Sequence, residues 1–261
     1  MPGIIMHNVW NYRNLIVKLA VTDLLVRYKN SVLGFLWSLL QPMLMFIVLY
    51  LVFSNLFRNN SVQNYPLFLL FGIISWGFFE KATNFSMNSI VSKPMLVKKI
   101  YFPREILVIS ACLTALMMTA LEFVVFGGFM ILFGVIPGPL ALLFPVLVVI
   151  EFFIALGVSL GIAALNVRYR DIQWMWAVIL QAGFFMTPVI YPMSIIENMS
   201  YASILKLNPM GMLIEAMRCT LIYNTPVAYG NVLVTVVVAV IAVVAGWLIF
   251  ARIEPTFAED V

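Results

Sequence analysis

An all-α polytopic membrane protein is the fold class that the sequence predicts, because of its hydrophobic content, its scarcity of charge and its recurring apolar runs. Hydrophobic residues make up 64% of the 261 residues and charged residues only 10%, and the mean hydropathy is +1.06. A soluble domain is about half apolar and about a quarter charged. Runs of about 20 apolar residues, enough for a helix to cross a bilayer, recur along the chain. We therefore expect a single transmembrane domain over residues 1–261.

The first expected element is an amphipathic helix over residues 8–22, lying in the inner membrane interface. Its apolar face carries Val9, Tyr12, Ile16, Leu19 and Ala20. Its other face is polar, as the 3.6-residue period requires of a helix at a boundary. The alternative is a juxtamembrane segment with no partner.

Six apolar runs follow this helix and are expected to cross the membrane. The expected spans are residues 32–57, 66–90, 106–133, 140–165, 172–191 and 232–250. A short re-entrant helix hairpin is expected over residues 192–223, because this external stretch is largely apolar and Asn208–Pro209 is typical of a helix start. Glu215 and Arg218 are spaced to pair on its second helix.

The distribution of basic residues predicts that both termini are cytoplasmic. Of the 15 Lys and Arg residues, eleven fall on the inner side of this topology, three on the outer side, and Lys81 within a span. This bias agrees with the positive-inside rule. The densest basic loop is residues 92–105, SKPMLVKKIYFPRE, which joins the second span to the third. A cytoplasmic loop of this kind can contact a soluble partner.

Three glutamates fall inside the expected spans. Glu80, Glu122 and Glu151 are costly in hydrocarbon, so each is a functional candidate. The alternative is that they are neutral or hydrogen-bonded between helices. Glu80 is expected to pair or share solvent with Lys81, which can reach the inner interface.

Several classes of site are missing from the sequence. No Gly-Lys dipeptide occurs, so the chain has no GxxxxGK[ST] phosphate loop, and neither GxSxG nor HExxH occurs. Cys112 and Cys219 stand far apart, and His7 has no neighbouring ligand residues. We expect no catalytic residue and no metal site, and no nucleic-acid partner because topology explains the basic residues. An intramembrane enzyme would lack a visible nucleophile.

Aromatic and amide side chains recur on the first, second and fifth expected spans. They are Trp37, Gln41, Tyr50, Phe53, Trp76, Phe79, Trp174, Gln181, Phe184 and Phe185. Rings that stack on the C–H faces of sugars, with occasional amides for the hydroxyls, suit a sugar pathway. The alternative is an ordinary aromatic belt or helix packing.

Five segments carry a resemblance to a known family. They are VRYKNSVLGFLWSLLQPML (26–44), VSKPMLVKKIYFPREIL (91–107), ALNVRYRDI (164–172), TPVIYP (187–192) and LNPMGMLIEAMR (207–218). In this order and spacing they resemble the membrane (permease) subunit of type-2 ATP-binding-cassette exporters, in the branch for polysaccharide, O-antigen and teichoic acid.

The resemblance implies a bacterial inner-membrane transport subunit that is not itself an enzyme. It implies a homodimer of this chain, docked to two copies of a nucleotide-binding ATPase that holds ATP and Mg, with no cofactor in this chain. The cargo would be a polyprenyl-pyrophosphate-linked glycan, moving between the two copies among membrane lipids. ATPase-coupling residues would be Arg13, Lys18, Lys98, Lys99 and Arg104.

Three basic residues near the inner interface are candidates for contact with the pyrophosphate. They are Arg27, Lys29 and Lys93, with topology and phospholipid contact as their alternative role. Three other functions remain open from the residues alone. They are a type-2 exporter of a lipid or drug, an ATPase-independent channel or carrier, and an anchor or assembly subunit without a path of its own.

Overall fold

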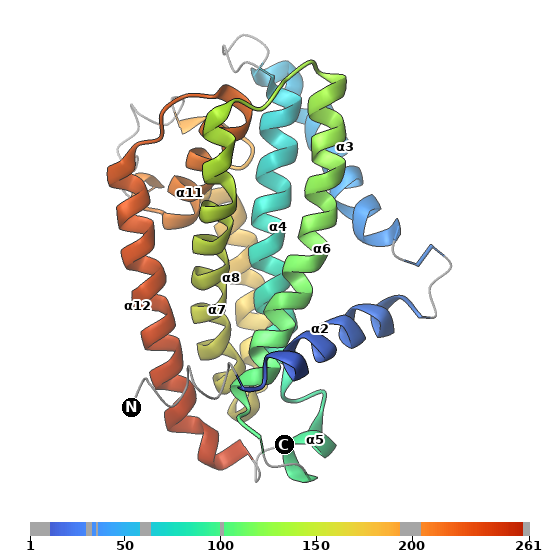
Figure 1. Cartoon of the computed structure of the whole chain (residues 1–261), viewed down its shortest axis with the longest axis vertical. Helices are drawn as coiled ribbons and strands as arrows, with labels where there is room; N and C mark the ends of the chain where they lie inside the picture. The colour runs from blue at the N-terminus through green and yellow to red at the C-terminus, as the bar shows by residue number, and fades with distance from the viewer. Residues whose placement is uncertain are drawn as a thin grey trace.

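The computed structural model describes residues 11–29, 33–34, 36–57, 64–99, 102–193 and 205–257. These residues form helices and connecting turns and contain no strand, which confirms the all-α prediction (Figure 1). The longer helices are α2 (Arg13–Tyr28), α3 (Leu36–Phe57), α4 (Tyr65–Ser89), α6 (Glu105–Leu132), α7 (Phe144–Arg168), α8 (Ile172–Met186), α11 (Pro209–Arg218) and α12 (Tyr229–Ile253). Shorter turns are α5 (Pro94–Lys99), η1 (Pro139–Leu143), η2 (Cys219–Tyr223) and η3 (Glu254–Thr256).

Four helices of the described part are long and apolar enough to cross a membrane. They are Leu36–Ser54, Glu105–Leu132, Pro139–Arg168 and Tyr229–Thr256. Helix α8 is apolar but has 15 residues and ends at Met186, five residues before the expected end of the fifth span. Helix α4 has 25 residues, with several polar residues among them. The six-span topology and the orientation of the termini stay predictions.

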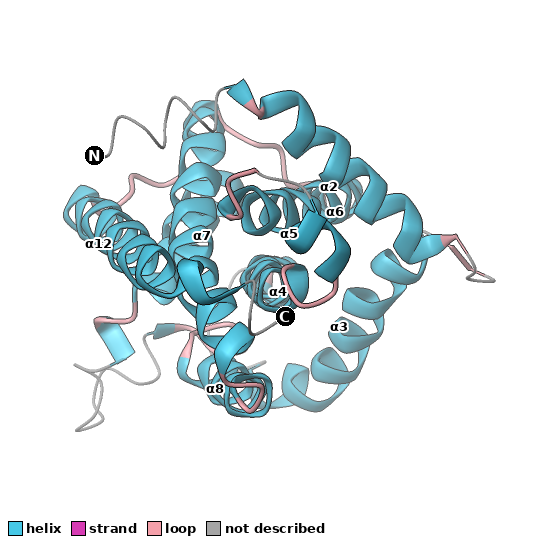
Figure 2. Ribbon diagram, turned by 90° about the horizontal axis from the view of Figure 1, so that it is seen from below, coloured by secondary structure: helices cyan, strands magenta, loops and turns pink. Residues whose placement is uncertain are grey.

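Helix α4 is the centre of the bundle. It packs against α6 and α7 on one side and against α3, α8 and α11 on others. The view along the bundle shows α4 among α3, α6, α7 and α8 (Figure 2). From Tyr65 to Trp76, Pro66 is the one residue that is not buried. The first half of α4 is therefore enclosed by protein on every side.

A pair of glycines brings α7 and α12 into close contact. A Cβ on Gly157 would overlap the backbone of Ala242, and a Cβ on Gly246 would overlap the Gly157 carbonyl. Small residues of this kind let helices in membranes approach closely and gain packing energy. The rest of α12 is poorly covered by the protein, since only 17% of the residues in its most apolar stretch are buried.

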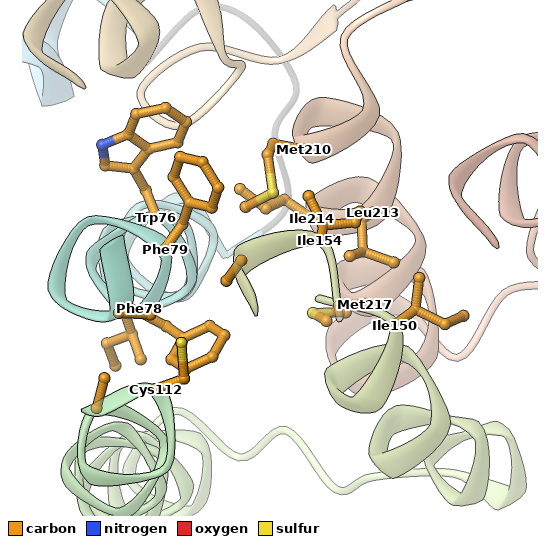
Figure 3. Close-up of a cluster of buried hydrophobic side chains, with 14 of the residues drawn as sticks. Trp76, Phe78, Phe79, Cys112, Ile150, Ile154, Met210, Leu213, Ile214 and Met217 are labelled. Carbon is orange, nitrogen blue, oxygen red and sulfur yellow. The ribbon is translucent and has the colours of Figure 1, made fainter. Parts of the chain in front are cut away.

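Helix α11 is a short helix inserted into the core beside α4 and α7. Asn208 caps its start by accepting hydrogen bonds from the amides of Met210 and Gly211 (3.0 and 3.4 Å), so the helix start expected at Asn208–Pro209 is present. Figure 3 shows Leu213 and Met217 of α11 close to aliphatic residues of α7. The first helix of the expected hairpin lies at residues outside the described ones.

Helix α2 lies obliquely against the foot of α6 (Figure 1). Ile16 and Ala20, on the face expected to be apolar, are buried, and the Thr114 hydroxyl of α6 donates to the Ala20 carbonyl at 3.2 Å. The helix continues to Tyr28, six residues past its expected end. Its attachment is thus to protein as well as to any membrane surface.

Candidate functional site

The basic loop after α4 is joined to the bundle near both of its ends. Lys93 binds Asp23 of α2 with Nζ–Oδ distances of 2.6 and 2.8 Å. Arg104 donates from Nη1 to the Glu254 carbonyl at 2.6 Å, beyond the end of α12. Between these anchors Lys98 is exposed on α5, and the side chain of Lys99 lies outside the described residues. The loop therefore presents an exposed middle between two fixed ends.

Four further basic residues lie on α2 or directly after it, and one of them contacts an aromatic ring. The Arg27 guanidinium lies 3.5 Å from the centroid of the Phe85 ring of α4, a distance typical of a cation–π contact. Arg13, Lys18 and Lys29 are exposed. A pyrophosphate at this end would find Lys29 accessible and would have to compete with Asp23 for Lys93.

Asp23 and Phe85 are contacts that the sequence analysis did not identify. Asp23 is the one acidic residue in α2, which is a usable signal: a lone carboxylate beside a basic loop is a candidate ion-pair partner. Phe85 carries no comparable signal, because phenylalanine is common throughout the chain.

The residues predicted to line a pathway fall into two groups. Trp76 and Phe79 are 6% and 8% exposed and lie inside the protomer. Trp76 packs edge-to-face on Phe184 at 6.5 Å, and Phe79 lies 6.3 Å from Trp176. Tyr50 and Phe53 are partly buried against the same core.

The second group is exposed on α3 and α8. Trp37 and Gln41 of α3 are exposed, as are Trp174, Gln181 and Phe185 of α8. These helices lie on the same flank of α4 (Figure 2). Five of the ten predicted pathway residues are thus accessible on the surface of one protomer, and their role stays a prediction.

The middle of the bundle contains a buried ion pair. Lys81 of α4 binds both carboxylate oxygens of Glu122 on α6, at 2.5 and 2.6 Å. The Lys81 ammonium group is thus bound by Glu122 and not by its neighbour Glu80, whose side chain is exposed, and the alternative that Glu80 and Lys81 share solvent stays a prediction. Glu151 of α7 is 1% exposed, and its Oε1 has no hydrogen-bond partner among the described groups. Glu122 and Glu151 are therefore enclosed by the protein, and Glu80 is not.

Arg218 joins several segments at the end of the bundle where α4 begins. The sequence indicated only that it pairs with Glu215, which lies 3.5 Å away. The Arg218 side chain is fully buried, and it donates to the carbonyls of Pro188 (2.7 Å), Val189 (3.0 Å) and Phe68 (3.0 Å). Burial lowers the pKa of Arg218 to about 10, so the group stays charged at neutral pH. This one cation therefore joins α11 to α4 and to the turn that follows α8.

Gly72 of α4 makes the space for that guanidinium. A Cβ at this position would collide with Arg218 Nη2 and would lie 2.9 Å from the Val189 carbonyl oxygen. The Arg218 aliphatic and guanidinium groups also lie over the Phe68 ring, with Cζ 3.4 Å from its centroid. Within the described residues, no cluster of three metal-ligating side chains accompanies these sites.

Comparison with known proteins gives consistent similarities over nearly the whole chain. Residues 15–222 match the ABC-2 type transporter family. The chain is 31% identical over 258 residues to the O-antigen export system permease protein RfbA of Myxococcus xanthus, covering 98% of this chain and 99% of that protein. Two RfbA permease proteins of Klebsiella pneumoniae are each 28% identical over 259 residues, covering 97% of both chains.

Proposed function

This chain belongs to the ABC-2 type transporter family, and we propose that it is the membrane subunit through which an O-antigen-type glycan leaves the cytoplasm. It is a multi-pass protein of the bacterial inner membrane. The observation that carries the proposal is the end-to-end similarity to O-antigen export permeases, at 98% and 99% coverage of the two chains. The glycan is proposed to be carried on a polyprenyl pyrophosphate.

ATP hydrolysis is assigned to a separate partner chain. The sequence contains no GxxxxGK[ST] phosphate loop, and this loop is the usual cradle for nucleotide phosphates. The exposed part of α5 at Lys98 supplies a contact surface for such a partner. Lys93 joins the loop to α2, and Arg104 joins it to the end of α12. A displacement of α5 by the partner would therefore move both helices.

A second copy of this chain is proposed to complete the transport path. Helices α3 and α8 expose large apolar and aromatic side chains such as Trp37 (52%) and Trp174 (71%). A hydrophilic polymer needs a protein-lined, wet route, because hydrocarbon offers its hydroxyl groups no hydrogen bonds. Nucleotide binding can open or close that route only if the ATPase binds the two states unequally.

The test is co-purification with the proposed partner ATPase, followed by glycan-dependent hydrolysis in lipid. We expect the paired substitution Lys98→Glu and Lys99→Glu to uncouple hydrolysis from export, since it reverses the charge of the α5 surface. Lys206→Glu is the matched control, because Lys206 is an exposed lysine near the opposite end of the bundle. If export and ATPase docking survive the charge reversals on α5, this loop has no part in the mechanism. If small amphiphiles stimulate ATP hydrolysis and glycan does not, the chain belongs to a drug or lipid exporter.

A further inference from the structure

The open face of α4 is polar, and it begins where the enclosed half of the helix ends. After Trp76 the residues of α4 that are not buried include Gly77, Glu80, Asn84 and Asn88. Their spacing of three and four residues places them on one face of the helix. We call these four residues the polar strip of α4.

The strip is uncovered because α3 leaves α4 along this half. Tyr50, in the second half of α3, stacks on Tyr65 of α4 at 6.3 Å, whereas Phe46, near the middle of α3, contacts Phe129 of α6 at 6.2 Å. The first half of α3 is largely exposed, and it leans away from α4 (Figure 1). Helix α8 borders the strip on the other side, where the Trp176 indole nitrogen donates to the Thr83 hydroxyl at 3.1 Å.

The depth of the strip makes its polarity expensive in a lipid environment. Glu80 lies 15 residues from Tyr65 and nine from Ser89, which is about 22 Å and about 13 Å along a helix. A bilayer core of about 30 Å therefore includes Glu80 when α4 crosses it. A carboxylate that faces hydrocarbon is strongly unfavourable, so water or polar groups must cover this face.

The strip carries hydrogen-bonding capacity that the protomer does not use. Among the described groups, neither the Glu80 carboxylate nor the Asn84 side-chain amide has a hydrogen-bond partner, and Asn88 donates only to the Asn84 carbonyl at 3.2 Å. Lys81 does not neutralise Glu80 by direct contact, since its ammonium group is held by Glu122. The strip thus offers one carboxylate acceptor and two amides, each able to donate and accept.

We infer that the polar strip of α4 is a binding site for sugar hydroxyl groups, in the half of the path nearest the cytoplasm. This inference rests on the proposed function and names its contact residues. Hydroxyl groups donate to a carboxylate and both donate to and accept from amides, so a neutral sugar matches the strip. An anionic headgroup would be repelled by the Glu80 carboxylate, and a dry protein interface would desolvate that carboxylate without giving it a hydrogen-bond donor.

Gly77 fits this role because it leaves the outer end of the strip without a side chain. A Cβ built there meets only the Lys81 side chain, at 4.0 Å, so the position is open toward the surface. The strip also differs from the predicted ring-lined path on the same helix. Trp76 and Phe79 face α8 and the core, whereas Glu80, Asn84 and Asn88 are among the groups of α4 that a polymer can reach.

Cysteine accessibility in the assembled transporter tests whether the strip is wet. Asn84→Cys, in a background with Cys219→Ser, is treated with the charged reagent MTSET in inside-out vesicles. Val240→Cys is the control, because Val240 is 58% exposed on the apolar surface of α12. We expect MTSET to modify position 84 and not position 240, and lipid-linked glycan extracted from the source cells to protect position 84.

Two labelling results would overturn the site. Reaction of Asn84→Cys with a lipid-dissolved maleimide but not with MTSET would mean that the strip faces lipid. Reaction with neither reagent would mean that it is sealed in a dry interface. Labelling needs no ATP turnover, so it can succeed or fail independently of whether a partner ATPase drives export.

A transport experiment then tests sugar binding itself. The combined variant Glu80→Gln, Asn84→Ala and Asn88→Ala should raise the glycan concentration for half-maximal ATPase stimulation by about tenfold, the effect of losing a few hydrogen bonds. The maximal rate should change less. Asn231→Ala, an exposed asparagine on α12, is the matched control. An unchanged half-maximal concentration in a transporter that still exports glycan would remove the strip and leave the proposed function intact.

Discussion

Helices α3 and α4 are adjacent in sequence, yet the protein uses them in opposite ways. Helix α3 is long and apolar enough to cross a membrane, with a mean hydropathy of 2.1, but only 17% of the residues in its most apolar stretch are buried. Helix α4 is less apolar, and it has 18 buried residues. Hydropathy therefore identifies the helix that meets lipid or a partner more readily than the helix on which the bundle is built.

The reason is that several buried polar groups on α4 have partners inside the protein. Thr83 and Ser86 bond to backbone carbonyls of α4 and α6, and Lys81 bonds to Glu122. A polar side chain that is satisfied by protein costs little in a membrane interior. Substitutions on α4 should accordingly disturb the protomer, and substitutions on α3 should disturb its surroundings.

The largest effect is expected from the buried ion pair. Glu122→Gln removes the carboxylate that binds the Lys81 ammonium group, which costs about 3 kcal/mol of unfolding free energy. Denaturation of the purified protein in mixed detergent micelles measures this loss. The double variant Lys81→Met and Glu122→Leu should recover most of it, because apolar residues can replace a buried pair. A single variant as stable as the parent would mean that α4 is not held to α6 by this contact.

The next prediction is that alanine substitutions at two glycines change the stability in opposite directions. Gly72→Ala should destabilise the protomer by about 2 kcal/mol, because the new methyl group displaces Arg218. Gly127→Ala on α6 meets nothing within 4 Å and should stabilise the helix by up to about 1 kcal/mol. Thermal unfolding of both variants in detergent gives the comparison. Equal shifts of the two melting temperatures would contradict the tight fit around Gly72.

A smaller effect distinguishes two tryptophans on α8. Trp176→Phe removes the hydrogen bond to Thr83 and should cost about 1 kcal/mol of unfolding free energy. Trp174 is 71% exposed, so Trp174→Phe should change that free energy by less than about 0.5 kcal/mol. Chemical denaturation resolves the difference. The same loss from both variants would show that α4 does not depend on this contact with α8.

The smallest effect on the protomer is expected on α3 itself. Val48→Ala, at a position 57% exposed, should alter the unfolding free energy by less than about 0.5 kcal/mol. Leu49→Ala, at the neighbouring position 9% exposed, should cost about 2 kcal/mol. If a second copy covers α3, Val48→Ala should instead lower the dimer fraction measured by light scattering. A large loss of protomer stability from Val48→Ala would reverse the comparison.

The sequence predicts where the helices of this protein begin and end better than it predicts which residues they contact. The third expected span, residues 106–133, differs from α6 (Glu105–Leu132) by one residue at each end, and the second differs from α4 in the same way. Apolar length, Asn208–Pro209 and the basic loops are local signals. Phe68, one partner of Arg218, lies 150 residues away from it, and Glu122 lies 41 residues from Lys81. No local pattern encodes those distances.

The face of each helix is the harder prediction. In a soluble protein the apolar side of a helix is the buried side, but lipid removes this contrast. Trp76 and Trp37 are equally plausible against lipid, core or cargo, and the first proves buried and the second exposed. On α4 the polar residues are the informative ones. Exposing Glu80 and Asn84 at membrane depth is unfavourable unless water or polar groups cover them.

The central claim is that this chain passes glycan only when a separate ATPase drives it. The most direct measurement is transport of fluorescent lipid-linked glycan into inside-out proteoliposomes that contain this chain with or without its ATPase. We predict accumulation only with the ATPase and hydrolysable ATP, and none with the Lys98→Glu and Lys99→Glu variant. Glycan entry at the same rate in vesicles that hold this chain alone would contradict the claim.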